Sequence, residues 1–333
     1  MRTYIQVLKL CLVLIVVVSA CAGFLVLLLG PASTLATPEA GLHGIDKANA
    51  LNDTRQTLLA AVGGIVVLVG AAYTSRTYYL GRRGQLTDRY AKAIALLASG
   101  QITERLGGVY ALEHLMIESD REHETVIEVL AAFIRERGSE AGSQGHGHAE
   151  HEHHHKDGSE KPRPETDVQA ALTVIGRRPK RAERNDIDLS YADLCGATLD
   201  GHLEGVIFWG AQLKSAVMIG GHLKRAVFCW AQMQDADISW GHLQCANFSY
   251  AQMQGVTLLN ARLRSADFTK ADLKDSTLCG ASLIWAKLSG TQLQGADFVT
   301  AVDGQIVKNA HGLSASQLKE AIIDETTRLP EGL

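Results

Sequence analysis

The sequence predicts a square β-solenoid that is preceded by two membrane-spanning helices and a small α-helical region. The main observation is a period of five residues, in which a large apolar side chain occupies every fifth position from Leu203 to Phe298, twenty positions in a row. At 46% apolar residues overall, such a run has a chance probability of roughly 10⁻⁷. The other two observations are a longer repeat of twenty residues and two uncharged apolar stretches before residue 76.

The composition of each five-residue unit indicates how the chain bends. A period of five fits neither a helix at 3.6 residues per turn nor a strand with a period of two. Two positions before each large residue the side chain is small, and it is Ala in thirteen of the twenty units. Gly-His-Leu recurs from 201, 221 and 241, so four units make one coil. Five coils at the inter-strand spacing give a rod about 24 Å long.

Several units carry a resemblance to a known family. They include 192–196 (Ala-Asp-Leu-Cys-Gly), 266–270 (Ala-Asp-Phe-Thr-Lys) and 271–275 (Ala-Asp-Leu-Lys-Asp), so the chain resembles bacterial membrane-anchored pentapeptide-repeat proteins. The resemblance implies a right-handed quadrilateral β-helix over 187–300 and no particular activity, because fold alone does not define function. Leu199 and Leu203 are only four residues apart, which predicts an irregular corner near Asp200.

Two apolar stretches near the N-terminus predict a transmembrane hairpin over 1–76. Residues 10–30 contain no charge, and residues 58–73 add sixteen uncharged residues, which is enough for a second and shorter span. Basic residues cluster outside the connecting loop at Arg2, Lys9, Arg76, Arg82, Arg83 and Arg89. Both termini are therefore expected in the cytoplasm, with the protein in the inner (cytoplasmic) membrane.

The alternative reading of the first stretch is a secretory signal. Residues 18–21, Val-Ser-Ala-Cys, resemble a lipoprotein cleavage box, and cleavage would leave Cys21 as a lipidated N-terminus. Residues 22–30 continue the apolar run, however, whereas a processing site normally ends it. The membrane hairpin is the better interpretation.

Residues 77–138 read as a cytoplasmic helical region of three short amphipathic helices. The first is expected to begin at Thr87, the second at Thr103, and the third to carry Val126 and end before Gly138. The pair Gly107-Gly108 lies inside the second helix with no preceding strand, which favours close helix packing over a phosphate loop.

Residues 139–165 are rich in Gly, Ser, Glu and Lys, as expected for a flexible linker. This linker holds six of the thirteen histidines: His146, His148, His151, His153, His154 and His155. Neutral imidazoles bind Zn²⁺ or Ni²⁺, so metal binding by this tract is the second functional hypothesis, beside a linker that merely tolerates histidine. No cofactor is expected elsewhere.

Capping segments are predicted at both ends of the solenoid. Residues 166–186 begin with a capping box, Thr166 to Gln169, which is expected to start a short helix. A basic run follows the helix, and it is either a solvated tether or a contact for anionic lipid. Residues 301–333 contain a second capping box, Ser314 to Gln317, before a helix expected to include Leu318 and Ile322. Such caps cover the open edges of a β-solenoid.

The outward positions of the solenoid supply the candidate interaction residues. Repeats of twenty predict a ladder of His202, His222, His242 and Arg262 on one wall and a ladder of Gln212, Gln232, Gln252, Asp272 and Gln292 on another. Outward aromatic residues of the kind that anchor protein interfaces are Trp230, Trp240, Tyr250 and Trp285. Cysteines 195, 229, 245 and 279 form no Cys-x-x-Cys pair and are expected to be ordinary surface thiols.

These features favour a protein without catalytic activity. The sequence shows no nucleophile with a base at a recognisable spacing and no phosphate loop. The leading hypothesis is a membrane-tethered scaffold that presents its β-helix for protein–protein interaction, and the alternative is a metal-responsive protein acting through the histidine tract. DNA mimicry, known in soluble members of the family, requires dense negative charge. Residues 187–300 carry ten carboxylates against eight cations, so nucleic-acid mimicry is not expected.

The predicted topology is testable by cysteine labelling on whole cells after removal of the native thiols. A membrane-impermeant reagent should modify Asp46→Cys, in the loop between the spans, and should spare Lys270→Cys, in the solenoid. Labelling of the second variant but not the first would reverse the assigned orientation.

Overall fold

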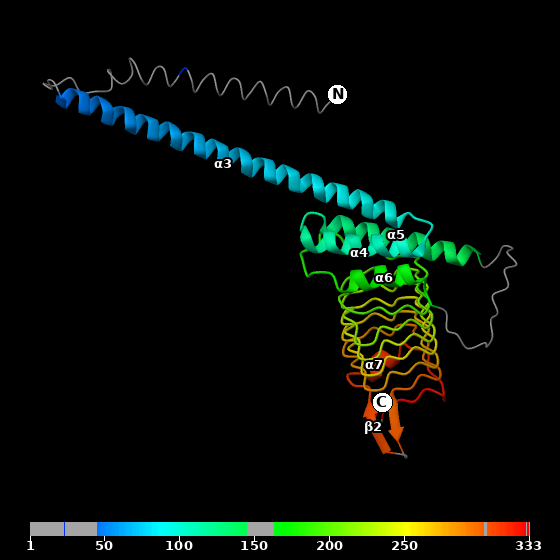
Figure 1. Cartoon of the computed structure of the whole chain (residues 1–333). Helices are drawn as coiled ribbons and strands as arrows, with labels where there is room; N and C mark the ends of the chain where they lie inside the picture. The colour runs from blue at the N-terminus through cyan, green and yellow to red at the C-terminus, as the bar shows by residue number, and fades with distance from the viewer. Residues whose placement is uncertain (1–22, 24–44, 145–162, 303–304, 331, 333) are drawn as a thin grey trace. The chain divides into compact units, whose positions relative to one another are not determined.

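The computed structural model describes residue 23 and residues 45–144, 163–302, 305–330 and 332 (Figure 1). The chain divides into two compact units, Met1–Gln85 and Leu86–Leu333. The first predicted span, residues 10–30, lies outside the described residues except for Gly23.

Helix α3 (Ile45–Leu97) is 53 residues long. Its stretch Arg55–Tyr79 is, among the described residues, the one helical segment long and apolar enough to cross a membrane. The expected helix start at Thr87 is wrong, because α3 runs through this position without interruption. No proline interrupts residues 76–97, and a Thr caps a helix only where the chain before it leaves the helical conformation.

Three further helices, α4 (Ile102–Glu118), α5 (His123–Gln144) and α6 (Thr166–Gly176), pack together at one end of the solenoid (Figure 1). The second predicted helix starts at Ile102 after Gln101, not at Thr103, and α5 continues past Gly138. The core of this bundle is aliphatic and consists of Val109, Leu112, Met116, Val126, Leu130, Ile134, Leu172 and Ile175. The bundle is thus held by one continuous apolar interior.

The predicted role of the Gly107-Gly108 pair is confirmed for its second member. Gly108 is buried, and a Cβ there would lie 2.7 Å from the backbone nitrogen of Leu97 in α3. Gly107 is exposed, with nothing within 4 Å of such a Cβ. One glycine is therefore required for helix contact and the other is not.

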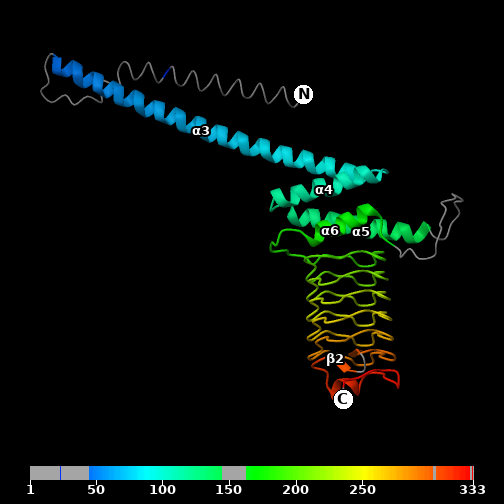
Figure 2. The ribbon, with the colours of Figure 1, turned by 60° about the horizontal axis from the view of Figure 1, so that its bottom comes forward.

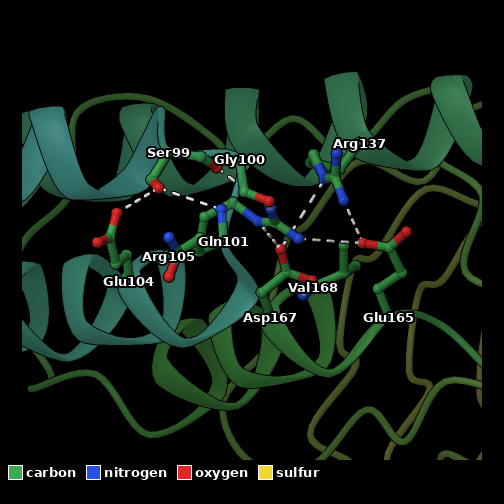
Figure 3. Close-up of polar contacts among 9 residues, drawn as sticks. All are labelled: Ser99, Gly100, Gln101, Glu104, Arg105, Arg137, Glu165, Asp167 and Val168. Atoms are coloured by element: carbon green, nitrogen blue, oxygen red, sulfur yellow. Dashed lines mark hydrogen bonds and ion pairs between the residues drawn. The ribbon is translucent and has the colours of Figure 1, made fainter.

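A buried ion pair fixes α6 to α4, as Figure 3 shows. Arg105 Nε donates to Asp167 Oδ2 at 2.5 Å, and Arg105 Nη1 donates to the carbonyl oxygen of Gly100 at 3.0 Å. Asp167 is fully buried, and its other carboxylate oxygen accepts the backbone N–H of Val168 at 3.0 Å. Because both charges are hydrogen-bonded, the pair tolerates burial, whereas loss of either partner would leave an uncompensated charge.

The basic run after α6 forms ion pairs within the protein, and we call these pairs the clamp. The two predicted roles, a solvated tether and a contact for anionic lipid, do not describe it. Arg177 makes a bidentate pair with Glu113 at 2.6 Å to each oxygen, and Arg178 pairs with Glu183 at 2.6 Å and 2.9 Å. Burial raises the pKa of Glu183, but hydrogen bonds from Arg178 and His123 outweigh it, so that this pKa is lowered overall. The clamp joins the helical bundle to the chain that enters the solenoid.

Helix α6 covers the first coil, as predicted, but it does not begin with a capping box. Glu165 precedes it, and Gln169 bonds the solenoid instead: its side chain donates to the Thr198 carbonyl at 2.7 Å and accepts the Thr198 N–H at 2.9 Å. At the other end of α6, the carbonyl of Gly176 accepts the N–H of His202 at 2.7 Å. The helix thereby satisfies backbone groups that an open coil would leave unpaired.

The repeat region is a four-walled solenoid of stacked coils (Figure 2). We name the walls by one coil: wall A carries His222, wall B Val227, wall C Gln232 and wall D Asp237. Each wall pairs in parallel with its equivalent twenty residues later, as in the bridge between His222 and His242. The predicted fold and its period are confirmed.

Inside the coils, each large residue lies over its equivalent. The rings of Phe208, Phe228, Phe248 and Phe268 stack with centroids 5.0 Å apart and planes within 6° of parallel. All four are fully buried, as are the small residues two positions earlier. Small side chains at these positions leave room for the large residues inside each coil.

The irregular corner near Asp200 is also confirmed. Thr198 pairs with Val217, nineteen residues on, whereas every later step on the walls up to Asp297 is twenty residues. Gly201, with φ of 90°, makes the bend, and a Cβ on it would lie 2.2 Å from the Gly176 carbonyl oxygen. Only glycine fits this contact between the shortened corner and α6.

The solenoid continues beyond residue 300, where we had placed its end. Strands β1 (Val299–Val302) and β2 (Gln305–Asn309) form an antiparallel hairpin, after which the chain returns to the coils. His311, Ile322 and Arg328 then form parallel bridges to walls A, C and D. The capping box at Ser314 is confirmed, but helix α7 (Ala315–Leu318) ends before Ile322, which pairs as a coil residue.

The register of the core predicts opposite effects for two neighbouring substitutions. Ala251 is buried and Gln252 is exposed, so Ala251→Trp should destabilise the fold by about 1–3 kcal/mol or more through overpacking, whereas Gln252→Trp should change stability little. Thermal unfolding of the two variants measures the difference, and equal melting temperatures would contradict this register.

Candidate interaction surface

The corners of the solenoid place outward side chains at a fixed spacing. The last residue of most pentapeptides has a positive φ, for example 61° at Trp230 and 60° at Tyr250. Gly210 and Gly220 adopt the same conformation at equivalent corners. A non-glycine residue in this region costs free energy, on the order of 1–2 kcal/mol. Bulky aromatic residues at these corners therefore carry a backbone cost that glycine would avoid.

The corner between walls B and C carries a column of aromatic rings. The ring of Trp230 stacks on that of Tyr250 with centroids 4.5 Å apart and planes 3° from parallel. Nearer the helical bundle, Tyr191 meets Trp209 edge to face at 4.8 Å. Lys270 Nζ closes the column 5.3 Å from the centre of the Tyr250 ring. We call Tyr191, Trp209, Trp230 and Tyr250 the aromatic column.

These four rings are well exposed although each contacts one other ring, Tyr191 with Trp209 and Trp230 with Tyr250. Their exposed fractions are 62% for Tyr191, 39% for Trp209, 55% for Trp230 and 38% for Tyr250. Gly210 lies directly under the Tyr191 ring, since a Cβ on this glycine would be 2.9 Å from two ring carbons. The glycine thus lets the Tyr191 ring lie flat at this corner.

Wall B adds a smaller apolar surface in two of these coils, because the coil of Tyr191 has Asp188 at the ladder position and the coil of Tyr250 has a polar residue there. Ile207 and Val227 occupy the ladder position of wall B, where later coils have Asn247, Asp267 and Lys287. Burial raises the pKa of Asp267, but hydrogen bonds from Thr269 and Lys287 outweigh it and lower this pKa, which keeps the rim of the patch charged. The outcome is an aromatic and aliphatic patch with a polar border.

The structure brings together two of the four predicted aromatic residues. Trp230 and Tyr250 are neighbours, but Trp240 lies at the corner between walls D and A. Trp285 lies on a third corner, between walls A and B, with the guanidinium of Arg264 4.3 Å above its ring. The four residues therefore do not form one site.

Tyr191 and Trp209 were missed by the sequence analysis. A step of twenty from Tyr191 leads to Ala211, an inward position, so no corner column is visible in the regular period. The signal for this column is the step of four residues between Leu199 and Leu203, which shortens the first coil from twenty residues to nineteen. A shift of nineteen aligns Tyr191 with Gly210, which is beside Trp209. Applying the shortened step to the outward residues would have completed the column.

The two predicted polar ladders are confirmed. The ring centroids of His202 and His222 are 5.2 Å apart, and those of His222 and His242 are 4.9 Å apart. Arg262 occupies the next position of this ladder. Burial and the charge of Lys180 lower the pKa of His202, and burial and Arg262 lower that of His242. Neighbouring cations also disfavour a bound metal ion at this ladder.

The glutamine ladder of wall C forms hydrogen bonds between coils. The bridges join Gln212, Gln232, Gln252, Asp272 and Gln292 in order. Neighbouring amides strengthen the ladder, since Gln234 Nε2 donates to Gln252 Oε1 at 2.8 Å and Gln254 Nε2 to Asp272 Oδ2 at 2.7 Å.

The histidine tract lies outside the described residues, so metal binding there stays a prediction. Across residues 45–144, 163–302 and 305–330, no group of three His, Cys, Asp or Glu side chains is arranged to hold a metal ion.

The thiols are not all surface groups. Cys245 is exposed, but Cys279 is buried and its thiol contacts the Asp297 carbonyl at 3.5 Å. Cys195 is half-buried, and burial together with Asp193 raises its pKa to about 11. The prediction of surface thiols is therefore wrong for Cys279, whose side chain is buried against the next coil at Asp297.

Comparisons with known proteins identify the repeat. The family model for pentapeptide repeats, in eight copies, matches residues 231–269, 242–278 and 266–302. The solenoid therefore carries pentapeptide repeats over residues 231–302, and such repeats imply a right-handed β-solenoid fold. No curated protein sequence matches the chain.

Two solved structures are similar to the chain. The first is HetL, a pentapeptide-repeat protein involved in heterocyst differentiation regulation from the cyanobacterium Nostoc. Its sequence is 24% identical, the match covers 43% of this chain and 75% of HetL, and the TM-score is 0.27. The second is trypsin-treated QnrB1, a plasmid-mediated fluoroquinolone resistance protein, with 19% identity, coverage of 42% and 78%, and a TM-score of 0.27.

Thiol reactivity tests the burial of the corners in variants that each retain one cysteine. Because its pKa is raised to about 11, Cys195 is almost wholly protonated near neutral pH, and its alkylation rate should rise about tenfold per pH unit between about pH 8 and pH 10. The exposed Cys245 should react faster than Cys195 at about pH 8. Equal rates for the two thiols at that pH would contradict the geometry.

Proposed function

We propose that the protein is a non-catalytic, membrane-tethered scaffold whose solenoid docks a partner protein on the aromatic column and the adjoining apolar part of wall B. The observation that carries the proposal is the column itself, four exposed aromatic rings aligned along one edge of a rigid rod. Tyr and Trp are the residues that most often dominate binding energy at protein interfaces.

The backbone beneath the column supports this role. The N–H of Trp230 donates to the Ser249 carbonyl at 3.1 Å, and that of Tyr250 to the Thr269 carbonyl at 3.0 Å, so each ring stands on a hydrogen-bonded corner. A partner that binds rings already held in place loses less conformational entropy than one that must order flexible side chains.

The tether in this proposal is the apolar stretch Arg55–Tyr79 of α3, together with the N-terminal span expected from residues 10–30. Side chains along Arg55–Tyr79 are exposed to the surroundings, as a lipid-facing helix requires. We place the protein in the inner membrane with the solenoid in the cytoplasm, on the basis of the flanking arginines.

Two thiols of the solenoid lack the activation that a nucleophile needs. Catalytic cysteines have a lowered pKa, whereas burial raises the pKa of both Cys195 and Cys229. This supports a binding role for the solenoid.

The test is site-specific photo-crosslinking of the full chain in its native membrane. A photoreactive amino acid at Ser190 or Ser249, on wall B beside the column, should give a discrete adduct with one protein, whereas Ser215 and Ser282, on other parts of the solenoid, should not. Trp230→Ala should then weaken affinity for that purified protein by about tenfold or more, which corresponds to an interface anchor.

The matched control is Trp285→Ala, which removes the same side chain at another corner and should leave affinity within about twofold. Replacement of all six linker histidines by Ser should also leave the adduct unchanged. Adducts of equal yield from every wall, or equal losses from the two Trp variants, would contradict a docking site at the column.

A further inference from the structure

Wall A concentrates the positive charge of the solenoid. Its outward positions hold Lys224, Arg225, Arg262 and Arg264 against the single carboxylate of Glu204. Residues 187–300 have ten carboxylates and eight cations, and four of the eight cations lie on this wall. A wall of this charge attracts anions and repels metal ions.

The cations of wall A meet a hollow near the C-terminal end of the solenoid. It has a volume of about 550 Å³, and no Asp or Glu lines it. Three successive rungs of the wall A ladder, Arg262, Ser282 and His311, lie along it. Arg264 and the amides of Gln244, Asn260 and Asn309 complete the polar lining, and the buried Oε1 of Gln244 accepts no hydrogen bond from the described residues. Hydrogen-bond donors therefore face the hollow from several coils and from the end of β2.

Both arginines of the hollow are exposed and available to an anion, and Arg264 is positioned by an aromatic ring. Neither Arg262 nor Arg264 makes an ion pair with any residue that the structure describes, whereas Arg328 pairs with Asp297 at 2.8 Å. The Arg264 guanidinium lies 4.3 Å above the centre of the Trp285 ring, and such stacking leaves the edge of the guanidinium free to donate. The backbone of Arg262 is fixed by a 2.9 Å hydrogen bond to the Gly241 carbonyl.

We propose that this hollow binds the phosphate group of a phosphate monoester, with Arg262 and Arg264 as its charged contacts. A guanidinium donates two parallel hydrogen bonds to a phosphate or a carboxylate. A single guanidinium therefore satisfies both oxygens of a carboxylate. Two guanidinium groups with neutral amide and hydroxyl donors around them suit the three terminal oxygens and double charge of a phosphate monoester. The monoester can be a soluble metabolite or the headgroup of phosphatidic acid.

The test uses the full chain purified in an uncharged detergent. Titration calorimetry with glycerol 3-phosphate near neutral pH should show saturable binding at one site per chain. Arg262→Gln and Arg264→Gln should each weaken the affinity by about tenfold or more, because each removes a charge-assisted hydrogen-bonding group. Arg264→Lys should also lose affinity, since it keeps the charge but removes the planar fork.

Arg225→Gln is the matched control, because it removes the same charge from the same wall two coils before the coil of Arg262 and Arg264. It should leave the affinity within about twofold. All these side chains are exposed, so the variants should keep the melting temperature of the parent, which is measured in parallel. Absence of saturable binding would overturn the proposal, because the hollow would then bind no phosphate. Equal losses of affinity in Arg225→Gln and Arg262→Gln would overturn it in favour of diffuse electrostatic attraction to wall A.

A second arm identifies the source of the phosphate. Uncharged micelles doped with phosphatidic acid are compared with micelles doped with phosphatidylcholine, and each is tested for competition against glycerol 3-phosphate. Competition by phosphatidic acid that disappears in Arg262→Gln assigns the hollow to a lipid headgroup. Binding of glycerol 3-phosphate without such competition assigns it to a soluble monoester, and both results support a phosphate site.

Discussion

The hydrogen bonds between successive coils are the constraint on which the rest of the structure depends. The N–H of Phe228 donates to the Asn247 carbonyl at 2.7 Å, and the N–H of Asn247 donates back to Ala226 at 2.9 Å, and this pattern repeats on every wall. Because all the bonds keep one register, each side chain lies over its equivalent in the next coil. Outward residues at equivalent positions of successive coils are thereby aligned in a column along the rod.

This stacking separates three chemistries on one solenoid. Phenylalanine fills the interior, aromatic rings stack along the corner between walls B and C, and arginine and histidine gather on wall A. In a globular domain such residues would be separated by loops and their positions would vary independently. Here one residue per coil at a fixed place is enough to build a surface. A single chain can therefore present a hydrophobic docking edge and a cationic wall without either disturbing the core.

The two ends of the solenoid solve the problem of unpaired edges in different ways. At the first coil, α6 bonds Thr198 through Gln169, and the ion pair between Arg105 and Asp167 holds α6 to the helical bundle. At the last coil, the chain after β2 returns to pair at His311, Ile322 and Arg328. Both ends are thus covered by the protein itself, which prevents edge-to-edge association of the rods.

The five-residue period determined the fold, the inward residues, the two polar ladders and the irregular corner at Gly201, because backbone stacking translates sequence distance directly into position. The predicted helix start at Thr87 was wrong because α3 continues through it, and the helix expected from Thr103 begins at Ile102. The capping box at Thr166 was wrong because Gln169 bonds Thr198, which is distant in sequence. Only the tertiary structure showed that Tyr191 and Trp209 form one column with Trp230, and that Arg262 and Arg264 border a hollow with His311. These groupings depend on a shortened corner and on a returning C-terminal coil, and neither obeys the local period.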